Sequence, residues 1–297
     1  MKSHSSTIIL GISLLIMSIL SLFIGVIDID LNSLISVGNG MELKIFLLSR
    51  IPRLLAILCT GMGMSVAGLI MQKLCMNKFV SPSTGATIQS AQFGILLSMV
   101  FIPSIGLRGR VMLAFFMSIL GTLIFVWFTQ KIHFKNTVLV PLIGIMFGNI
   151  LGGITSFIAY KFEVTQQLSA YFVGSFALII KGNYELVWLV VPLVIIAFIF
   201  ANYFNIVGMG KDFSQNLGVN YKVVFFLGLT IASMITASIV TIVGQISYIG
   251  LIIPNIVAMF KGDKIRGTLV DTALLGALFT LVCDMLARSV IMPYELP

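Results

Sequence analysis

Charged residues are scarce in this 297-residue chain, and their scarcity excludes an ordinary soluble globular protein. Only 9% of the residues are charged, whereas 59% are hydrophobic and the mean hydropathy is +1.12. Soluble domains carry about 25% charged residues. The long uninterrupted apolar runs also differ from the weak alternation of a membrane β-barrel. The composition therefore predicts an all-α fold, a polytopic transmembrane helix bundle.

Cysteine and histidine are also rare, which leaves little material for a metal centre or a disulfide framework. Cys59, Cys75 and Cys283 form no Cys-x-x-Cys motif, and His4 and His133 fall in a tail and a loop. The sequence has no Gly-x-x-x-x-Gly-Lys-Ser/Thr loop, so the chain cannot hydrolyse ATP by a P-loop mechanism. We expect no metal, no cofactor and no catalytic residue. Lysines and arginines flanking membrane spans explain the net charge of +8 without nucleic acid as a partner.

Nine apolar segments are separated by polar or charged stretches. A helix needs about 20 apolar residues to cross the hydrocarbon, so the 38-residue charge-free run at 223–260 must contain a break, which Gly244 and Pro254 offer. Residues 161–185 are too polar to cross and suit a short interfacial helix. The predicted spans are 7–27, 54–72, 86–107, 111–130, 136–160, 186–204, 223–243, 248–260 and 268–291.

The second span begins with an unusual basic pair. Arg50 and Arg53 bracket Pro52, which suits the first turn of a helix because its missing N–H costs nothing there. Desolvating a guanidinium in the bilayer is costly, so both arginines should lie at the interface on roughly one face. They could anchor the helix by snorkelling or serve a partner.

The ninth span contains two carboxylates. Asp284 and Arg288 lie four residues apart in the favourable acid-before-base order and can pair. Asp271 remains as the only candidate coupling group for an ion-driven secondary transporter, the competing hypothesis. A membrane enzyme should show clustered His, Asp or Glu, which the spans lack.

Loop charges favour a cytoplasmic amino terminus, with ten basic residues on the inner side and eight on the outer side. This topology places Arg50, Arg53 and Arg288 outside. It places inside the polar stretch 208–222, in which Asp212–Asn216 forms a short amphipathic turn capped by Gly218. That stretch is typical of a docking element facing solvent.

Several motifs together resemble the FecCD family of ABC importer permeases for iron-siderophores, haem and vitamin B12. They are SRIPRLLA with AGLIMQ, NKFVSPSTGA, NLGVN, GLIIPNI, and LLGALFTLVCDMLAR before ELP. The resemblance covers essentially the whole chain and implies a type II importer permease, with residues 1–297 forming one transmembrane domain in the cell membrane. It implies a second permease around a central pathway, two cytoplasmic ATPase subunits and an extracellular binding lipoprotein.

The resemblance also implies site residues. The outer pockets that receive acidic residues of the binding protein would be formed by Arg50, Arg53 and Arg288. ATPase coupling would fall on Lys211, Asp212, Phe213, Ser214, Leu217, Gly218 and Val219. Intramembrane polar residues are pathway candidates, although most such amides bond neighbouring helices; they are Gln72, Gln89, Gln92, Asn149 and Ser156.

Within the family, NKFVSPSTGATIQSAQFG and MPYELP look most like Gram-positive permeases for ferric catecholate siderophores of the petrobactin type. Such systems commonly pair two different permeases, which favours a heterodimer over a homodimer. Haem and cobalamin are the alternative substrates within the family. Family members usually continue past ELP into a tenth helix, whereas this sequence stops at Pro297, so nine spans with an outer carboxyl terminus are expected.

Overall fold

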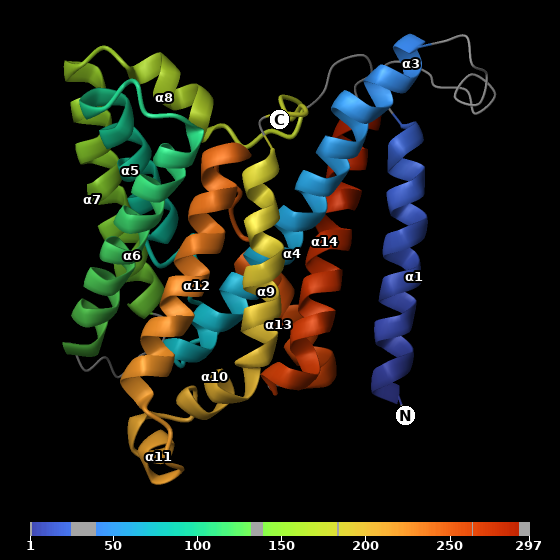
Figure 1. Cartoon of the computed structure of the whole chain (residues 1–297). Helices are drawn as coiled ribbons and strands as arrows, with labels where there is room; N and C mark the ends of the chain where they lie inside the picture. The colour runs from blue at the N-terminus through green and yellow to red at the C-terminus, as the bar shows by residue number, and fades with distance from the viewer. Residues whose placement is uncertain (1, 25–39, 132–138, 183, 263, 291–297) are drawn as a thin grey trace.

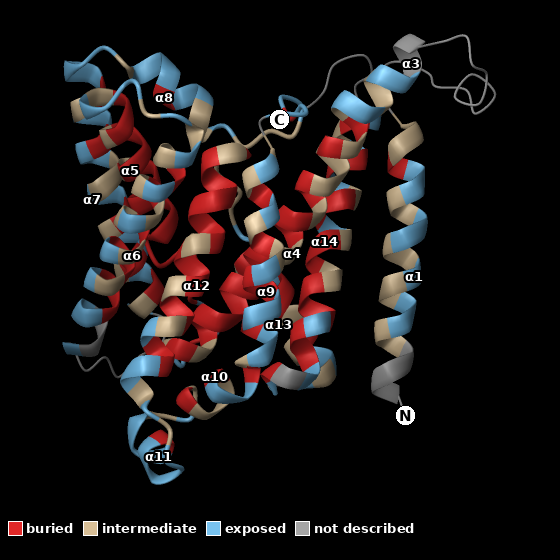
Figure 2. Ribbon diagram, viewed as in Figure 1, coloured by how far each residue is buried: buried red, intermediate tan, exposed pale blue. Residues whose placement is uncertain are grey.

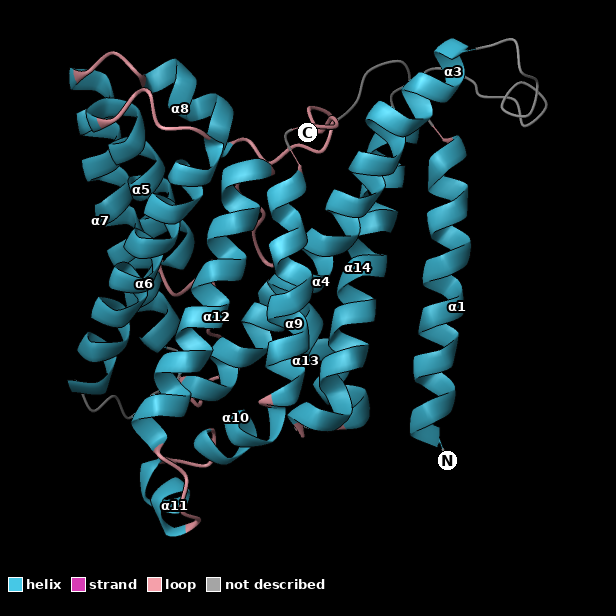
Figure 3. Cartoon of the chain, in the orientation of Figure 1, coloured by secondary structure: helices cyan, strands magenta, loops and turns pink. Residues whose placement is uncertain are grey.

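A computed structural model describes residues 2–24, 40–131, 139–182, 184–262 and 264–290. These residues form helices joined by loops, as predicted, with one isolated β-bridge and no β-strand among them (Figure 3). The elements in chain order are α1 Lys2–Phe23, α3 Gly40–Ile45, η1 Phe46–Arg50, α4 Ile51–Leu74, α5 Thr87–Phe101, α6 Leu107–Lys131, α7 Leu139–Lys161, α8 Thr165–Phe172, η2 Glu185–Leu189, α9 Val190–Ile199, α10 Ala201–Val207, α11 Lys211–Asn216, α12 Tyr221–Ile242, α13 Ile249–Lys261 and α14 Ile265–Ser289.

All nine predicted spans correspond to helical segments, but their lengths differ from the prediction. Six helical segments in the described part of the chain are long and apolar enough to cross a membrane: α1, α3–η1–α4, α6, α7, α12 and α14. The predicted sixth span is a bent pair, because α10 turns away from η2–α9 by 63°. With that pair counted as one crossing, the described residues provide seven.

The other two predicted spans are short helices. α5 has 15 residues and α13 has 13 residues, so they extend about 22 Å and 20 Å, less than the ~30 Å hydrocarbon core. The prediction of a full third span at 86–107 was therefore wrong in length. A buried loop, 80–86, leads into α5, and irregular backbone at membrane depth is tolerated where protein covers it.

The break in the long charge-free run lies at only one of the two predicted residues. Gly244 adopts a φ of +92° and separates α12 from α13, as predicted. Pro254 lies inside α13 and does not end it, so the prediction of a break there was wrong. The Asn255 side chain donates to the carbonyl oxygens of Lys78 and Leu251 and ties this part of α13 to the loop after α4.

α4 lies at the centre of the bundle, and most of its length is buried (Figure 2). Pro52 lies in the first turn of α4, but α3 and η1 precede it in one continuous helical segment, so the predicted helix start there was wrong. The small residues of α4 allow close helix contacts: a Cβ added at Gly68 would overlap the Gly250 carbonyl oxygen of α13, and one added at Gly61 would overlap the Gly276 carbonyl oxygen of α14. The predicted packing role of these glycines is confirmed.

The glycines of α7 divide into two pairs. Gly144 and Gly148 are buried against Thr84 and Gln89, whereas Gly152 and Gly153 meet no described neighbour within 4 Å. The predicted small-residue contact face therefore packs inside the protomer along only part of its length.

The two ends of the bundle carry different elements (Figure 1). The start of α1 lies at the same end as α11, which extends beyond the spans; we call this the α11 end. α3, α8 and the last turn of α14 lie at the opposite end, the α8 end. α8 confirms the short helix predicted within residues 161–185.

Candidate functional site

An ion-paired cluster at the α8 end brings together two of the predicted arginines. Asp284 on α14 is paired with Arg288 one turn later, at 2.8 Å between Oδ2 and Nη2, which confirms the predicted pair. Arg53 on α4 also pairs with Asp284, at 2.8 Å between Nη2 and Oδ1. The Asp284 side chain is 2% exposed and that of Arg53 13% exposed. One carboxylate thus holds two guanidinium groups from antiparallel helices.

The arginines also cap the end of α1. The last carbonyl groups of a helix lack intrahelical donors and carry partial negative charge. Arg50 Nη1 donates to the Leu22 carbonyl oxygen at 2.8 Å. Arg288 Nη1 donates to the Ile24 carbonyl oxygen at 2.7 Å, and its Nη2 donates to the Ser21 hydroxyl at 2.6 Å. These contacts tie α1 to η1, which leads directly into α4, and to α14.

Arg50 and Arg288 are largely buried inside the protein. Arg50 is 9% exposed and Arg288 is 5% exposed, which a desolvated guanidinium tolerates because Asp284 and the carbonyl oxygens of α1 supply its acceptors. Arg50, Arg53, Asp284 and Arg288 make up this arginine cluster. Its role in docking stays a prediction.

The α11 element has the predicted local structure. The N–H of Gly218 donates to Gln215 and that of Val219 to Ser214, and Gly218 has a φ of +73°. These are the two hydrogen bonds of a Schellman cap, which confirms Gly218 as the cap residue. Ser214 is buried, and its hydroxyl donates to the Gly210 carbonyl oxygen at 2.7 Å.

The predicted coupling residues divide by exposure. Phe213 and Leu217 are exposed, so they leave an apolar pair at the tip of the α11 end. Lys211, Asp212 and Gly218 are exposed beside them. Val219 is half-buried and packs against the core, so it contributes to the fold of the loop. No contact in the described chain tests the ATPase role of these residues, which stays a prediction.

The five pathway candidates lie in different environments. Gln72 is buried and donates to the Leu251 carbonyl oxygen at 3.4 Å, and Gln92 donates to the Gln245 side chain at 3.0 Å. Gln89 is a residue of α5, and its side chain lies against Gly148 of α7. Asn149 and Ser156 are exposed on one face of α7. Only these two belong to an open helix face, whereas Gln72 and Gln92 bond other parts of the protomer.

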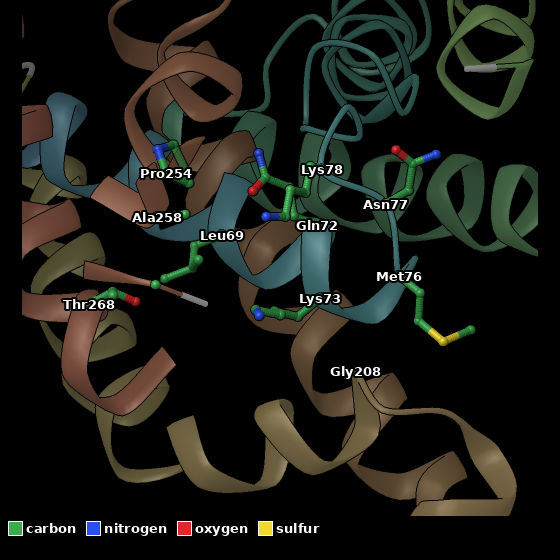
Figure 4. A pocket seen from close by; sticks show the side chains of 11 residues that line it. Leu69, Gln72, Lys73, Met76, Asn77, Lys78, Gly208, Pro254, Ala258 and Thr268 are labelled. Carbon is green, nitrogen blue, oxygen red and sulfur yellow. The ribbon is translucent and has the colours of Figure 1, made fainter. Parts of the chain in front are cut away.

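A cavity of about 190 Å³ lies at the α11 end between α4, α13 and the start of α14. Figure 4 shows Gln72 and Lys73 of α4 across from Pro254 and Ala258 of α13. Gly208, three residues before α11, also lines the cavity. The half-length helix α13 is therefore not fully packed against the end of α4.

The Asp271 carboxylate is engaged in the structure. It pairs with Lys261 of α13 and accepts a hydrogen bond from the Thr7 hydroxyl of α1 at 2.7 Å. A coupling carboxylate for a proton or sodium ion would have to be released from this pair. In the described part of the chain, no three His, Cys, Asp or Glu residues are grouped as metal ligands would be.

Comparison with known proteins gives matches over nearly the full chain. The FecCD transport family model matches residues 13–297. The chain is 43% identical over 287 residues to the petrobactin import system permease YclN of Bacillus subtilis, covering 97% of this chain and 90% of that protein. It is 37% identical to the petrobactin import system permease FatD of Bacillus anthracis, covering 98% of this chain and 85% of that protein.

A solved structure described as an inward-facing conformation of a metal-chelate type ABC transporter has the same fold. It superposes with a TM-score of 0.82 at 24% identity, covering 99% of this chain and 93% of that chain. At this identity the likeness supports the fold and no substrate.

Proposed function

Because this chain belongs to the FecCD transport family, we propose that it is the permease subunit of an ABC importer that moves a ferric siderophore into the cytoplasm. The observation that carries the proposal is the 43% identity to a petrobactin import permease over 97% of the chain. The helices supply a multi-pass membrane scaffold. In this proposal the chain hydrolyses no ATP itself.

We propose a ferric catecholate siderophore of the petrobactin type as the substrate. Two petrobactin permeases are similar to this chain over 97% and 98% of its length, and a ferric-anguibactin permease of Vibrio anguillarum is 36% identical over 93%. Uptake of radioactive iron by cells with and without the gene tests this. Loss should be specific to ferric catecholate; specific loss of ferric hydroxamate or haem uptake, or competition by cobalamin, would refute the substrate assignment.

Two cytoplasmic ATPase subunits would bind at the α11 end. Phe213 and Leu217 offer exposed apolar side chains there, on a loop whose shape the Schellman cap fixes. Replacing both with Asp should abolish co-purification of the ATPase, since each would place a charge in an apolar contact. Leu139→Asp is the matched control, an exposed leucine at the start of α7. ATPase retained by the double variant would refute this interface.

The extracellular binding lipoprotein would dock at the α8 end. The guanidinium groups of the arginine cluster lie in low-dielectric surroundings, where their potential reaches further than in water and attracts acidic groups. Arg53 is the test residue because its side chain is the most exposed of the three ion-paired residues. Arg53→Gln should lower the association rate with the binding protein by about 2- to 10-fold at low salt, and the difference should vanish at 1 M salt.

Lys161→Gln is the control for docking, because Lys161 is an exposed cation that also lies at the α8 end, as the last residue of α7. An association rate unchanged by Arg53→Gln would remove the arginine cluster from the docking surface. Equal losses in both variants would assign the effect to overall charge.

A second permease would face the open side of α7. The exposed residues Asn149 and Ser156 lie there among apolar side chains, beside the unpacked Gly152 and Gly153. We propose that this face borders the central pathway and that the partner is a different permease. Co-purification of two differently tagged copies of this chain would refute the heterodimer in favour of a homodimer.

The α11 end, with the start of α1, would face the cytoplasm. The loop-charge bias supports this orientation. In a cysteine-free background, Lys211→Cys should resist a membrane-impermeant maleimide in intact cells and react after lysis. Reaction in intact cells would reverse the topology.

A further inference from the structure

Two loops meet near the α8 end in a short backbone bridge. One follows α8, and the other connects α12 to α13. The Ser175 N–H donates to the Val243 carbonyl oxygen at 2.9 Å, and the Gln245 N–H donates to the Phe172 carbonyl oxygen at 3.3 Å. Val173 and Gln245 form the isolated parallel β-bridge. The end of α8 is thereby joined to the segment that leads into α13.

Two glycines permit this approach. A Cβ added at Gly174 would collide with the Gln245 carbonyl oxygen, and one added at Gly244 would come within 2.7 Å of the Val173 carbonyl oxygen. Gly244 also has a φ of +92°, which side-chain-bearing residues rarely adopt. Each of the two loops therefore has a glycine at the point where the two backbones are closest.

The side chain of Gln245 extends the bridge to α5. Its Oε1 accepts from Nε2 of the buried Gln92 at 3.0 Å, and its own Nε2 donates to the Ser247 hydroxyl oxygen at 3.2 Å. An amide can accept on one side and donate on the other, which an apolar side chain cannot do. Gln245 is thus held from three directions: by the loop after α8, by α5 and by Ser247 just before α13.

α13 connects this bridge to the opposite end of the molecule. It begins at Ile249, two residues after Ser247, and ends at Lys261, which pairs with Asp271 of α14. Pro254, Ala258 and the following Gly262 line the cavity of about 190 Å³ that Gly208 also borders, just before α11. α11 packs against α10, α10 against α14 and α14 against α13, so a shift of α11 can reach α13 through this series of packed helices.

We propose that the Gln245 side chain, by bonding Gln92 of α5 and Ser247, holds the backbone bridge between α8 and the start of α13 in place, so that the two helices move as one unit during transport. The inference rests on the proposed function, because it assigns α11 to the ATPase side and α8 to the binding-protein side. A displacement of α13 at the α11 end would carry α8 with it. The physical basis is a continuous set of hydrogen-bonded and packed elements between the two ends.

The first test measures the mechanical link without requiring a substrate. In a full chain lacking native cysteines, spin labels at Ser169→Cys of α8 and Met259→Cys of α13 occupy exposed positions. The distance distribution between them should be narrow in the parent protein and broader in Gln245→Met and Gln92→Met. Gln167→Met, an exposed glutamine on α8, is the matched control and should leave it narrow. If neither Gln245→Met nor Gln92→Met changes the distribution of distances between the spin labels, the proposal is overturned.

The second test measures transport by the complete complex with its ATPase and binding protein. Gln245→Met should reduce transport by about 2- to 30-fold, which corresponds to the coupling energies found along such networks. Basal ATP hydrolysis should be unchanged, and the melting temperature should fall only by the few degrees that one lost buried hydrogen bond costs. Adding Gln92→Met should cause little further loss, because both substitutions remove the same hydrogen bond. Equal losses of transport, basal hydrolysis and thermal stability would indicate a purely structural role and overturn the proposal.

The two failures are distinguishable. A parent complex that transports no ferric siderophore would contradict the proposed function, while the spin-label distances would still decide whether the Gln245 side chain holds the bridge between the two helices.

Discussion

The Asp284→Asn substitution probes the cluster that holds α1, α4 and α14 together. It removes a carboxylate that pairs with both Arg53 and Arg288, whose side chains are 13% and 6% exposed. Removing one partner of a buried ion pair costs about 3–5 kcal/mol, because the remaining charge stays desolvated. For a chain of this size each kcal/mol lowers the melting temperature by about 2–3 °C, so we expect a decrease of about 6–15 °C. Thermal unfolding followed by size-exclusion chromatography measures it.

A double-mutant cycle separates the ion pair from other effects of the substitution. Arg53→Gln removes one guanidinium, so Arg53→Gln combined with Asp284→Asn should be less destabilising than the sum of the single variants, by about 0.5–3 kcal/mol. Glu185→Gln is the control, because Glu185 is an exposed carboxylate at the same end and Gln retains the acceptor for the Gly182 N–H. A melting temperature unchanged by Asp284→Asn, or strict additivity in the cycle, would refute the reasoning.

Two further predictions test the packing and the loop at the α11 end. Gly68→Val should destabilise the fold by about 1–3 kcal/mol or more, because a Cβ at this position has no space beside Gly250. Gly11→Ala is the control and should not destabilise the fold, because Gly11 has no neighbour within 4 Å. Equal melting temperatures of the two variants would contradict the contact between Gly68 and Gly250. Burial raises the pKa of the Cys75 thiol, which lies just after α4, to about 12. Little thiolate therefore exists at pH 8, so alkylation of Cys75 should be slow and should accelerate about tenfold per pH unit. Rapid alkylation at pH 8 in a variant that retains only Cys75 would contradict this.

Local sequence patterns predicted features that depend on local geometry. The Gly218 cap and the Asp284–Arg288 pair each follow from local spacing, and the structure has both. The helix start predicted at Pro52 failed because the helical segment begins earlier in the chain. The break at Gly244 followed from the length of the charge-free run. Pro254 was misassigned because a proline can remain inside a helix when neighbouring groups satisfy the freed backbone.

Contacts between distant segments could not be predicted in the same way. Arg53 lies opposite Asp284 because α4 and α14 are antiparallel and touch at Gly61 and Gly276, each eight residues from its charged residue. That register appears only when the two helices are known to pair. The capping of α1 by Arg50 is equally non-local. The burial of Arg50 and Arg288 therefore does not follow from local sequence patterns.

Half-length helices were also difficult to recognise. The segment at 86–107 is charge-free throughout, but α5 ends at Phe101 because Pro103 and the following turn interrupt it. Composition does not distinguish a full crossing from a short helix with an apolar turn. Gln245 gave no signal either, since a single amide in an apolar run is usual where helices bond one another.

The most direct test of the proposed function is transport by the purified complex in proteoliposomes. Ferric catecholate bound to the binding protein would be supplied outside, with ATP enclosed in the lumen beside the ATPase. We expect accumulation of iron with ATP and none with only a proton or sodium gradient, and replacing both Phe213 and Leu217 with Asp should abolish it. Accumulation driven by an ion gradient without ATP would contradict the account and favour a secondary transporter.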